Sequence, residues 1–261
     1  MTARTITSLA NPTVKAVRAL HLRKARLESG TFLAEGLKIV AEAVALGRIP
    51  RVLLYSAAAA GHPLLRQAAE ISGEAIEVSP AILAKISRRD NPQTVLGVFE
   101  QSFTPLGDLR PADAPCWVAL QAVRDPGNLG AIVRTADAAG CGGVILVGDC
   151  CDPFSVEAVR ATMGSIFAVT IAKAAEADFI TWLKTWPGEI VGALLTATTD
   201  FRAATYRRPA MILMGNEQAG LPSSLVGACH ASVKIPMRGR ADSLNLAVAA
   251  GIMIYAATAL P

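Results

Sequence analysis

The sequence predicts an α/β protein with two domains, since apolar runs of strand length alternate with helical patterns along most of the chain. With 52% hydrophobic and 18% charged residues among 261, the composition is that of a globular chain with a large core. The stretch 101–115 carries three prolines and interrupts the alternation. We therefore expect a smaller α/β domain over residues 1–102, a linker over 103–115, and a larger parallel-sheet domain over 116–261.

The smaller domain is expected to begin with one helix over residues 11–29. Asn11 is a suitable N-cap, Pro12 suits the first helical position, and Gly30 follows the last turn. The periodicity of the residues that follow predicts strands at 31–34, 51–55, 75–78 and 94–99 and helices at 37–46, 64–71 and 81–86.

The larger domain contains apolar runs that are rich in β-branched residues and have the length of buried parallel strands, at 117–122, 144–147, 169–172, 190–195, 211–214 and 232–235. The final apolar stretch, 244–260, is interrupted only by Asn245 and Thr258 and lacks basic anchors on its C-terminal side. We expect it to be a helix buried in a core or an interface, not a membrane span.

The N-terminal segment is strongly basic. Nine Lys and Arg and three Glu lie between Arg4 and Arg51, an excess of six positive charges on a chain whose net charge is +4. Such a segment indicates an anionic macromolecular partner, with nucleic acid first. We expect the contacts to come from the cations of the first helix, Lys15, Arg18, Arg23, Lys24 and Arg26. The alternative is an ordinary solvated helix face.

The cysteine and histidine patterns do not predict a metal site. The five cysteines are an odd number without metal-ligand spacing, and His21, His62 and His230 are isolated. Free thiols in a reducing compartment are the expected state. The Arg-rich start superficially resembles a transit peptide, but the same residues also predict a capped helix, which we prefer. We therefore expect a cytoplasmic protein without a metal.

Three segments marked by Gly and Asn follow predicted strands of the larger domain. They lie at 125–134, 215–222 and 235–245. Each is expected to be a loop at the carboxyl end of a strand, where open α/β sheets bind their ligands. These loops bring polar side chains to an otherwise apolar scaffold, as a small-molecule site requires, through Asn128, Arg134, Glu217, Ser243 and Asn245.

Common ligand-binding fingerprints are absent from these loops. Gly127 and Gly130 form G-x-x-G and not the G-x-G-x-x-G of dinucleotide sites. Gly215 and Gly220 have the spacing of a P-loop, but Leu-Pro at 221–222 replaces the Lys-Ser/Thr pair that would hold phosphate and magnesium. There is no G-x-S-x-G elbow.

The three segments resemble, in order, the signature motifs of the SpoU (TrmH-like) branch of the SPOUT RNA methyltransferases. They read N-x-G-x-x-x-R-T-A, G-N-E-x-x-G-L and I-P-M-x-G-x-x-x-S-L-N-x-x-x-A-A, and the resemblance covers about residues 116–259. Residues 32–36 carry a weaker resemblance to an L30e-like substrate-binding domain. The resemblance implies a knotted catalytic domain, S-adenosylmethionine as cofactor, and methylation of a ribose 2′-hydroxyl of rRNA or tRNA, with rRNA favoured.

The resemblance also implies roles for particular residues. Arg134 becomes the central catalytic residue, with Asn128, Glu217, Ser243 and Asn245 as the polar shell. Because the pKa of an arginine lies above about 12, we expect Arg134 to stabilise an oxyanion or clamp phosphate, with Glu217 or an RNA phosphate as the alternative proton acceptor. The expected cofactor-binding residues are Leu213, Met214, Gly215, Asn216, Gly220, Ile235, Pro236, Met237, Ser243 and Leu244.

The family is further expected to work as a homodimer whose active site draws on both subunits. We expect this interface on the C-terminal helix, because Ile252, Met253 and their apolar neighbours leave it no wide polar face.

Two other functions are weighed against methyl transfer, a catalytically silent RNA-binding or ribosome-assembly factor and a dinucleotide-dependent enzyme. Taken singly, Arg134 also suits a salt pair with Asp137, Asn128 an N-cap, and Glu217 a cap of the following turn.

Overall fold

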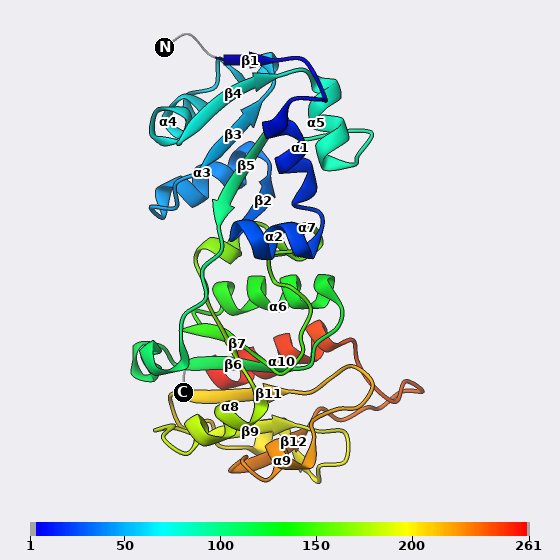
Figure 1. Cartoon of the computed structure of the whole chain (residues 1–261). Helices are drawn as coiled ribbons and strands as arrows, with labels where there is room; N and C mark the ends of the chain where they lie inside the picture. The colour runs from blue at the N-terminus through cyan, green and yellow to red at the C-terminus, as the bar shows by residue number, and fades with distance from the viewer. Residues whose placement is uncertain (1–3, 260–261) are drawn as a thin grey trace. The chain divides into compact units, whose positions relative to one another are not determined.

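In the computed structural model, which describes residues 4–259, the chain divides into two compact units (Figure 1). The N-terminal unit contains residues up to Gln101 together with Asp152–Ala168, and the C-terminal unit contains Ser102–Cys151 and the residues from Val169 onward. Both units are α/β, as predicted. The units differ from the predicted domains in the segment 152–168, which the sequence analysis placed in the larger domain.

The N-terminal unit is built on a mixed five-stranded sheet in the order β1-β4-β3-β5-β2. Its strands are β1 (Arg4–Ile6), β2 (Thr31–Glu35), β3 (Val52–Tyr55), β4 (Glu74–Val78) and β5 (Val95–Glu100). Strands β1, β4 and β3 are parallel, whereas β5 runs antiparallel to both of its neighbours. Figure 1 shows helices on both sides of this sheet, α1 (Pro12–Ala19) and α5 (Pro80–Ser87) on one and α3 (Leu37–Ala45) and α4 (Pro63–Ile71) on the other.

The predicted helix over 11–29 is two helices, α1 and α2 (Arg23–Ser29). The chain leaves the helical path at Leu20, whose side chain is buried in the core beside α5. The break frees the Leu20 carbonyl, and the guanidinium of Arg26 donates to it at 2.7 Å. A buried carbonyl without a partner would cost free energy, so Arg26 stabilises the break.

The segment 152–168 packs against β2 of the N-terminal unit. Phe154 and Phe167 lie against Phe32 with ring centroids 4.9 and 5.6 Å away, and the segment forms the short helix α7 (Val156–Thr162). Arg160 on α7 makes two hydrogen bonds to the buried carboxylate of Glu35, at 3.0 and 2.7 Å. Aromatic packing and a forked ion pair therefore hold this segment, although it connects two strands of the C-terminal unit.

The C-terminal unit contains a seven-stranded parallel sheet in the order β10-β12-β9-β11-β6-β7-β8. Six of its strands confirm the predicted runs, and the two-residue strand β10 (Thr199–Asp200) was not predicted. The six are β6 (Cys116–Gln121), β7 (Gly143–Val147), β8 (Thr170–Ala174), β9 (Ile190–Ala193), β11 (Ala210–Met214) and β12 (Ala231–Lys234). Its helices are α6 (Pro126–Ala138), α8 (Glu176–Leu183), α9 (Ser223–Val226) and α10 (Leu246–Thr258).

Helix α10 packs against α6 and against strands β11 and β6. Residue 260 of the predicted helix lies outside the described residues. Met253 is fully buried within the C-terminal unit, so it does not lie on a face free for a partner, contrary to the prediction. The face that remains is lined by Val248 and Tyr255, which are 53% and 56% exposed, with Ile252 half-buried between them. Among the described residues, no helix has the length and apolar character that a membrane crossing demands.

Candidate active site

A pocket of about 550 Å³ lies at the carboxyl ends of β9, β11 and β12. Each of the three motifs contributes to its wall, the first through Asn128 alone. The other lining residues are 193–196, 214–221, Val233, Ile235, Met237, 243–246 and Ala249. The pocket therefore lies where the site was predicted, beyond the carboxyl ends of parallel strands.

The two glycines of the second motif close its loop. The backbone of Asn216 pairs with that of Gly220 through two hydrogen bonds, at 3.1 and 2.9 Å. A Cβ at Gly215 would overlap the backbone of Gly220, and Gly220 itself has a φ of +68°. Both positions therefore require glycine for the shape of the loop.

Asn216 holds this loop in place. Its side-chain oxygen accepts from the backbone N–H groups of Gln218 and Ala219, at 2.9 and 3.0 Å. Its amide nitrogen donates to the carbonyl of Ala122 at 2.8 Å, at the end of the strand that leads into the first motif. The turn after Glu217 is thus capped by Asn216, and the alternative role considered for Glu217 is not observed.

Glu217 connects the second motif to the first. Its carboxylate accepts from the backbone N–H groups of Arg124 and Asp125, each at 3.3 Å, and from the side-chain amide of Asn128 at 3.4 Å. These donors surround the N-terminus of α6, where the helix dipole favours an anion. Glu217 therefore positions the start of α6 beside the pocket.

Asn128 is also the contact point for the third motif. The side chain of Asn245 donates to the side-chain oxygen of Asn128 at 2.9 Å. The oxygen of Asn245 caps α10 by accepting from Ala247 N–H at 2.9 Å. Asn128 is not the N-cap of α6, because Asp125 has that role. One chain of hydrogen bonds, from Asn245 through Asn128 to Glu217, thus joins all three motifs, and we call it the motif network.

Arg134 does not line this pocket. It lies six residues after Asn128 on α6, about 9 Å farther along the helix axis and about 120° around it. Its side chain is exposed, and no hydrogen bond or ion pair joins it to Asp137 or to any other described residue. The pocket brings together four of the five predicted catalytic residues, namely Asn128, Glu217, Ser243 and Asn245, and leaves Arg134 outside.

Most of the predicted cofactor-binding residues line the pocket, but Leu213 and Pro236 do not. The side chain of Leu213 is only 1% exposed and belongs to the core beneath the sheet, because alternate residues of a strand face opposite sides. Further lining residues were not predicted from the sequence, among them residues 194–196 in the loop after β9 and Leu246 and Ala249 of α10. The position of residues 194–196 at a strand's carboxyl end was the signal that could have identified them.

Most side chains of the pocket wall are apolar, and the polar ones are those of the motif network and of Thr196, Asn216, Gln218 and Ser243. Of the described residues that line it, none is Lys or Arg, and its charged residue is Glu217. A ligand carrying phosphates would need cations or free amide donors here. The lining therefore disfavours a dinucleotide and suits a ligand with an apolar plane and no net negative charge. The described residues also contain no cluster of His, Cys, Asp and Glu able to hold a metal ion.

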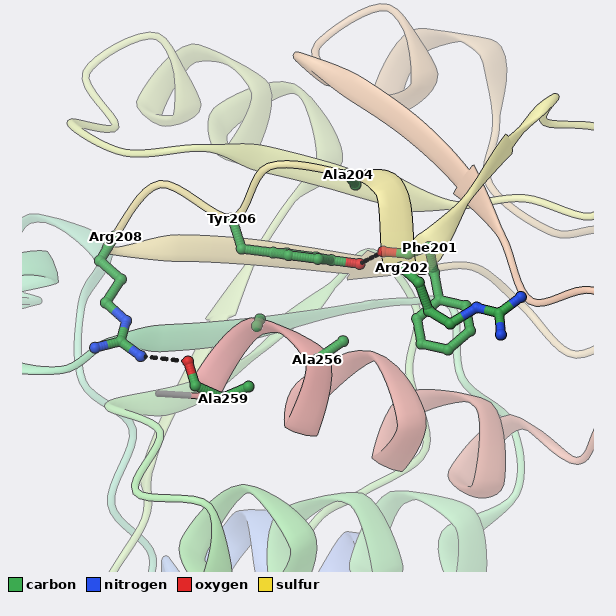
Figure 2. Close-up of a pocket in the computed structure, with 8 residues that line it drawn as sticks. Phe201, Arg202, Ala204, Tyr206, Arg208, Ala256 and Ala259 are labelled. Carbon is green, nitrogen blue, oxygen red and sulfur yellow. Dashed lines mark hydrogen bonds between the residues drawn. The ribbon is translucent and has the colours of Figure 1, made fainter. Parts of the chain in front are cut away.

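A larger hollow of about 930 Å³ lies toward the other end of α10 (Figure 2). Its arginines are engaged, since Arg202 pairs with Asp200 and Arg208 donates to the carbonyl of Ala259 at 2.9 Å. Figure 2 shows Tyr206 bonded to the Phe201 carbonyl, at 2.7 Å, and burial raises the pKa of this phenol to about 12. Because no motif residue lines this hollow, we do not assign the chemistry to it.

Four of the five predicted nucleic-acid contacts remain available in the N-terminal unit. Lys15, Arg23 and Lys24 are exposed, and Arg18 is half-exposed. The side chain of Arg26 is only 4% exposed and bonds the carboxylate of Asp152 at 2.9 and 2.7 Å, so it does not face solvent as predicted. Arg26 is buried, and not exposed as predicted, because the break after α1 turns its side chain toward the segment that begins at Asp152.

Comparison with known proteins finds one match in each part of the chain. Residues 115–255 match the SpoU rRNA Methylase family, and residues 11–97 match the MRM3-like substrate binding domain. The 23S rRNA (guanosine(2553)-2′-O)-methyltransferase RlmP of Bacillus subtilis is 28% identical over 96% of this chain and 97% of its own. The 23S rRNA (uridine(2479)-2′-O)-methyltransferase of Streptomyces viridochromogenes is 30% identical over 90% of this chain and 85% of its own.

A solved structure shows similarity along nearly the whole chain. The AdoMet-bound rRNA methyltransferase from Sinorhizobium meliloti is 48% identical, with a TM-score of 0.92 over 98% of this chain and 97% of its own. Similarity of this extent includes the pocket and both units.

Proposed function

Because the chain belongs to the SpoU rRNA methylase family, we propose that it transfers a methyl group from S-adenosylmethionine to a ribose 2′-hydroxyl of ribosomal RNA. The observation that carries the proposal is the motif network in the wall of the pocket, which joins three segments distant in sequence. A catalytically silent factor would have no need of such a network. The five cysteines are an odd number without metal-ligand spacing, as is common in a reducing compartment, and we place the activity in the cytoplasm.

The pocket fits the cofactor. Its volume of about 550 Å³ lies in the range of small-molecule sites, roughly 300–1,000 Å³. Leu221, Ile235 and Leu246 offer apolar contacts for an adenine plane, and Glu217 is an acidic group on a wall without cations. The bound cofactor supplies a methyl group already activated on a sulfonium. The chain therefore has to hold the ribose in line with that methyl group and help remove the hydroxyl proton.

Arg134 is the residue that we assign to the ribose oxygen and its phosphate. A guanidinium stays charged throughout, so it stabilises a developing oxyanion and does not act as a base. Since the Arg134 side chain is exposed, unpaired among residues 4–259, and not among the residues that line the pocket of its own chain, we propose that it completes the pocket of a partner subunit. The second copy would cover the apolar face of α10 that Val248, Ile252 and Tyr255 leave open.

Sedimentation of a Val248→Asp variant tests the homodimer. Val248 is half-exposed in the first turn of α10, where an acidic residue is compatible with the helix dipole, so the subunit should still fold. A charge in the apolar interface should raise the dimer dissociation constant on the order of tenfold to hundredfold. Methyl transfer should fall at low protein concentration and return as the concentration is raised. A folded monomer with full activity would contradict the shared site.

The activity itself is tested by incubating the purified protein with methyl-labelled S-adenosylmethionine and either 23S rRNA or total tRNA. We expect label in the rRNA, recovered after nuclease digestion as a 2′-O-methylated nucleoside. Mapping ribose methylation in a deletion strain against its parent would then identify the nucleotide. Label on a base, or RNA binding without any transfer, would contradict the proposal.

A further inference from the structure

Six cations of the N-terminal unit are engaged in ion pairs with described residues. The pairs are Arg4–Glu74, Lys24–Glu28, Arg26–Asp152, Lys38–Glu42, Arg51–Glu100 and Arg160–Glu35. Among the described residues of this unit, five cations without an ion pair lie on α1 and α5 or directly after α5, namely Lys15, Arg18, Lys85, Arg88 and Arg89. Because α1 and α5 pack against each other, Arg18 of α1 comes close to Lys85 and Arg88 of α5.

Three of these cations surround a notch of about 500 Å³. Its walls are Arg18 from the last turn of α1 and Lys85 and Arg88 from the end of α5, with Ala84 as the fourth lining residue. Each cation taken alone suits a helix C-terminus, where the dipole favours positive charge. Three of them around one hollow, with no carboxylate in its lining, repel one another unless an anion lies between them.

The backbone of Arg88 is a second observation at this notch. Arg88 is the C-cap residue of α5 and has φ 56° and ψ 40°, in the left-handed region where glycine is preferred. A residue with a Cβ pays on the order of 1 kcal/mol for this conformation. Met163, the C-cap residue of α7, has the same conformation, so the φ of Arg88 marks a helix end where glycine is able to replace it without strain.

The two walls of the notch are fixed relative to each other by His21. Its Nε2 lies 2.6 Å from the carbonyl of Ile86, so the turn after α1 is tied to the last turn of α5. Burial, with the charge of Arg88 adding to it, lowers the pKa of His21, which keeps the ring neutral at pH 7. A neutral ring donates to the carbonyl without adding a further charge to the notch.

We propose that the notch formed by Arg18, Lys85 and Arg88 is a phosphate-binding subsite for the backbone of the RNA substrate. The proposal rests on the proposed function, to which it adds a specific substrate contact. Two arginine forks and a lysine ammonium, open to solvent on one side, match a phosphodiester that enters from outside the protein. Arg26 and Lys24, which pair with carboxylates, are not part of this contact.

An Arg88→Gly variant tests the subsite without destabilising the helix end. Glycine adopts the left-handed conformation freely, so the melting temperature should stay the same or rise. With a 23S rRNA transcript as the probe, the dissociation constant should rise about three- to tenfold. The slope of its logarithm against the logarithm of salt concentration should fall by about 0.7–0.9 for the lost phosphate contact. Lys85→Ala should act in the same direction, and the affinity for S-adenosylmethionine should not change.

Arg66→Ala is the matched control. Arg66 is an exposed cation on α4, on the other side of the same sheet, and has no ion pair with a described residue. If Arg66→Ala weakened RNA binding as much as Arg88→Gly, general charge and not a subsite would be responsible. An unaltered salt slope in Arg88→Gly would overturn the RNA subsite.

The two proposals fail in distinguishable ways. Notch-dependent RNA binding by a protein that transfers no methyl group would refute the proposed function and leave the subsite standing. Normal methyl transfer with RNA affinity indifferent to Arg88 and Lys85 would refute the subsite alone. A wild-type protein without measurable RNA affinity would overturn the subsite as well.

Discussion

The motif network of the C-terminal unit and the cationic notch of the N-terminal unit are both polar, but their polar groups are held in opposite ways. In the motif network, Asn245, Asn128 and Glu217 each have a hydrogen-bond partner in another motif. In the notch, the side chains of Arg18 and Arg88 have no hydrogen-bond or ion-pair partner among the described residues. The hydrogen bonds of the motif network are complete without a ligand. The cations of the notch gain a partner only when an anionic ligand binds.

This contrast follows from what each region has to do. In-line methyl transfer depends on the alignment of two reacting groups, and alignment requires side chains already fixed by hydrogen bonds. A phosphate backbone has the same charge at every nucleotide, and its capture requires charge more than exact placement. Arg134 in the C-terminal unit differs from the residues of the motif network, because its side chain, like the cations of the notch, has no ion pair with a described residue. Its freedom suits a group that acts on RNA and not on the cofactor.

The largest effect, on stability, should come from Arg26, which was predicted to contact RNA but is buried. Arg26→Ala leaves the carboxylate of Asp152 buried without its partner, which should cost about 3–5 kcal/mol of stability in the N-terminal unit. Arg23→Ala, three residues earlier and exposed, should change stability by no more than about 0.5 kcal/mol. Hydrogen exchange in β2 and in residues 152–168 would measure both. Equal protection in the two variants would show that the buried pair does not hold this segment.

Arg134→Ala should have the next largest effect, on chemistry and not on folding. Loss of the guanidinium should reduce kcat for methyl transfer by about 10²–10³, the range for removal of one oxyanion donor. S-adenosylmethionine binding and the melting temperature should stay nearly the same, because the Arg134 side chain lines no part of the pocket and makes no hydrogen bond or ion pair with another described residue. Single-turnover kinetics and calorimetry would separate the two effects. Transfer at the wild-type rate would remove Arg134 from the mechanism.

The sequence predicted the strands of the larger domain well because buried parallel strands are continuous apolar runs. It also predicted the polar residues of the pocket, since three motifs at strand ends converge in any sheet of this kind. It predicted the helix–strand alternation of the smaller domain but not β1, whose three residues are too short to show a pattern.

The failures share one cause, which is a partner distant in sequence. Arg26 was expected on the surface, but Asp152 is 126 residues away and no local pattern connects the two. Met253 was expected at an interface, because an all-round apolar helix does not reveal which side its own sheet covers. Lys85 and Arg88 were not singled out, since they join Arg18 only when α5 packs on α1.

Asn245→Ala should disturb the motif network at one end. The change removes both the bond to Asn128 and the cap of α10, and loss of such a cap costs about 1 kcal/mol. We expect affinity for S-adenosylmethionine and the rate of transfer to fall together, by about tenfold, because the third motif forms part of the pocket wall. Ser243→Ala is the matched control, since the Ser243 hydroxyl bonds only its neighbour Asp242 among the described residues, at 3.4 Å. A larger loss in Ser243→Ala would place the cofactor contact at Ser243 and not in the network.

The smallest effect concerns the pH dependence of the stability that His21 contributes beside the notch. Since the pKa of folded His21 is lowered, its contribution to stability is complete above the ordinary value of 6.5 and is lost as the pH falls through the folded pKa. The charges around the ring are mixed, because Arg88 and Arg160 oppose its protonation and Glu35 favours it. His21 is only half-buried, so solvent screens the effect, and we expect a loss of no more than about 0.5 kcal/mol between pH 7 and pH 5. His21→Gln keeps a donor for the Ile86 carbonyl but does not titrate, so hydrogen exchange in α5 should depend less on pH in that variant. Exchange with the same pH dependence in both proteins would show that the tie between α1 and α5 is insensitive to the charge on His21.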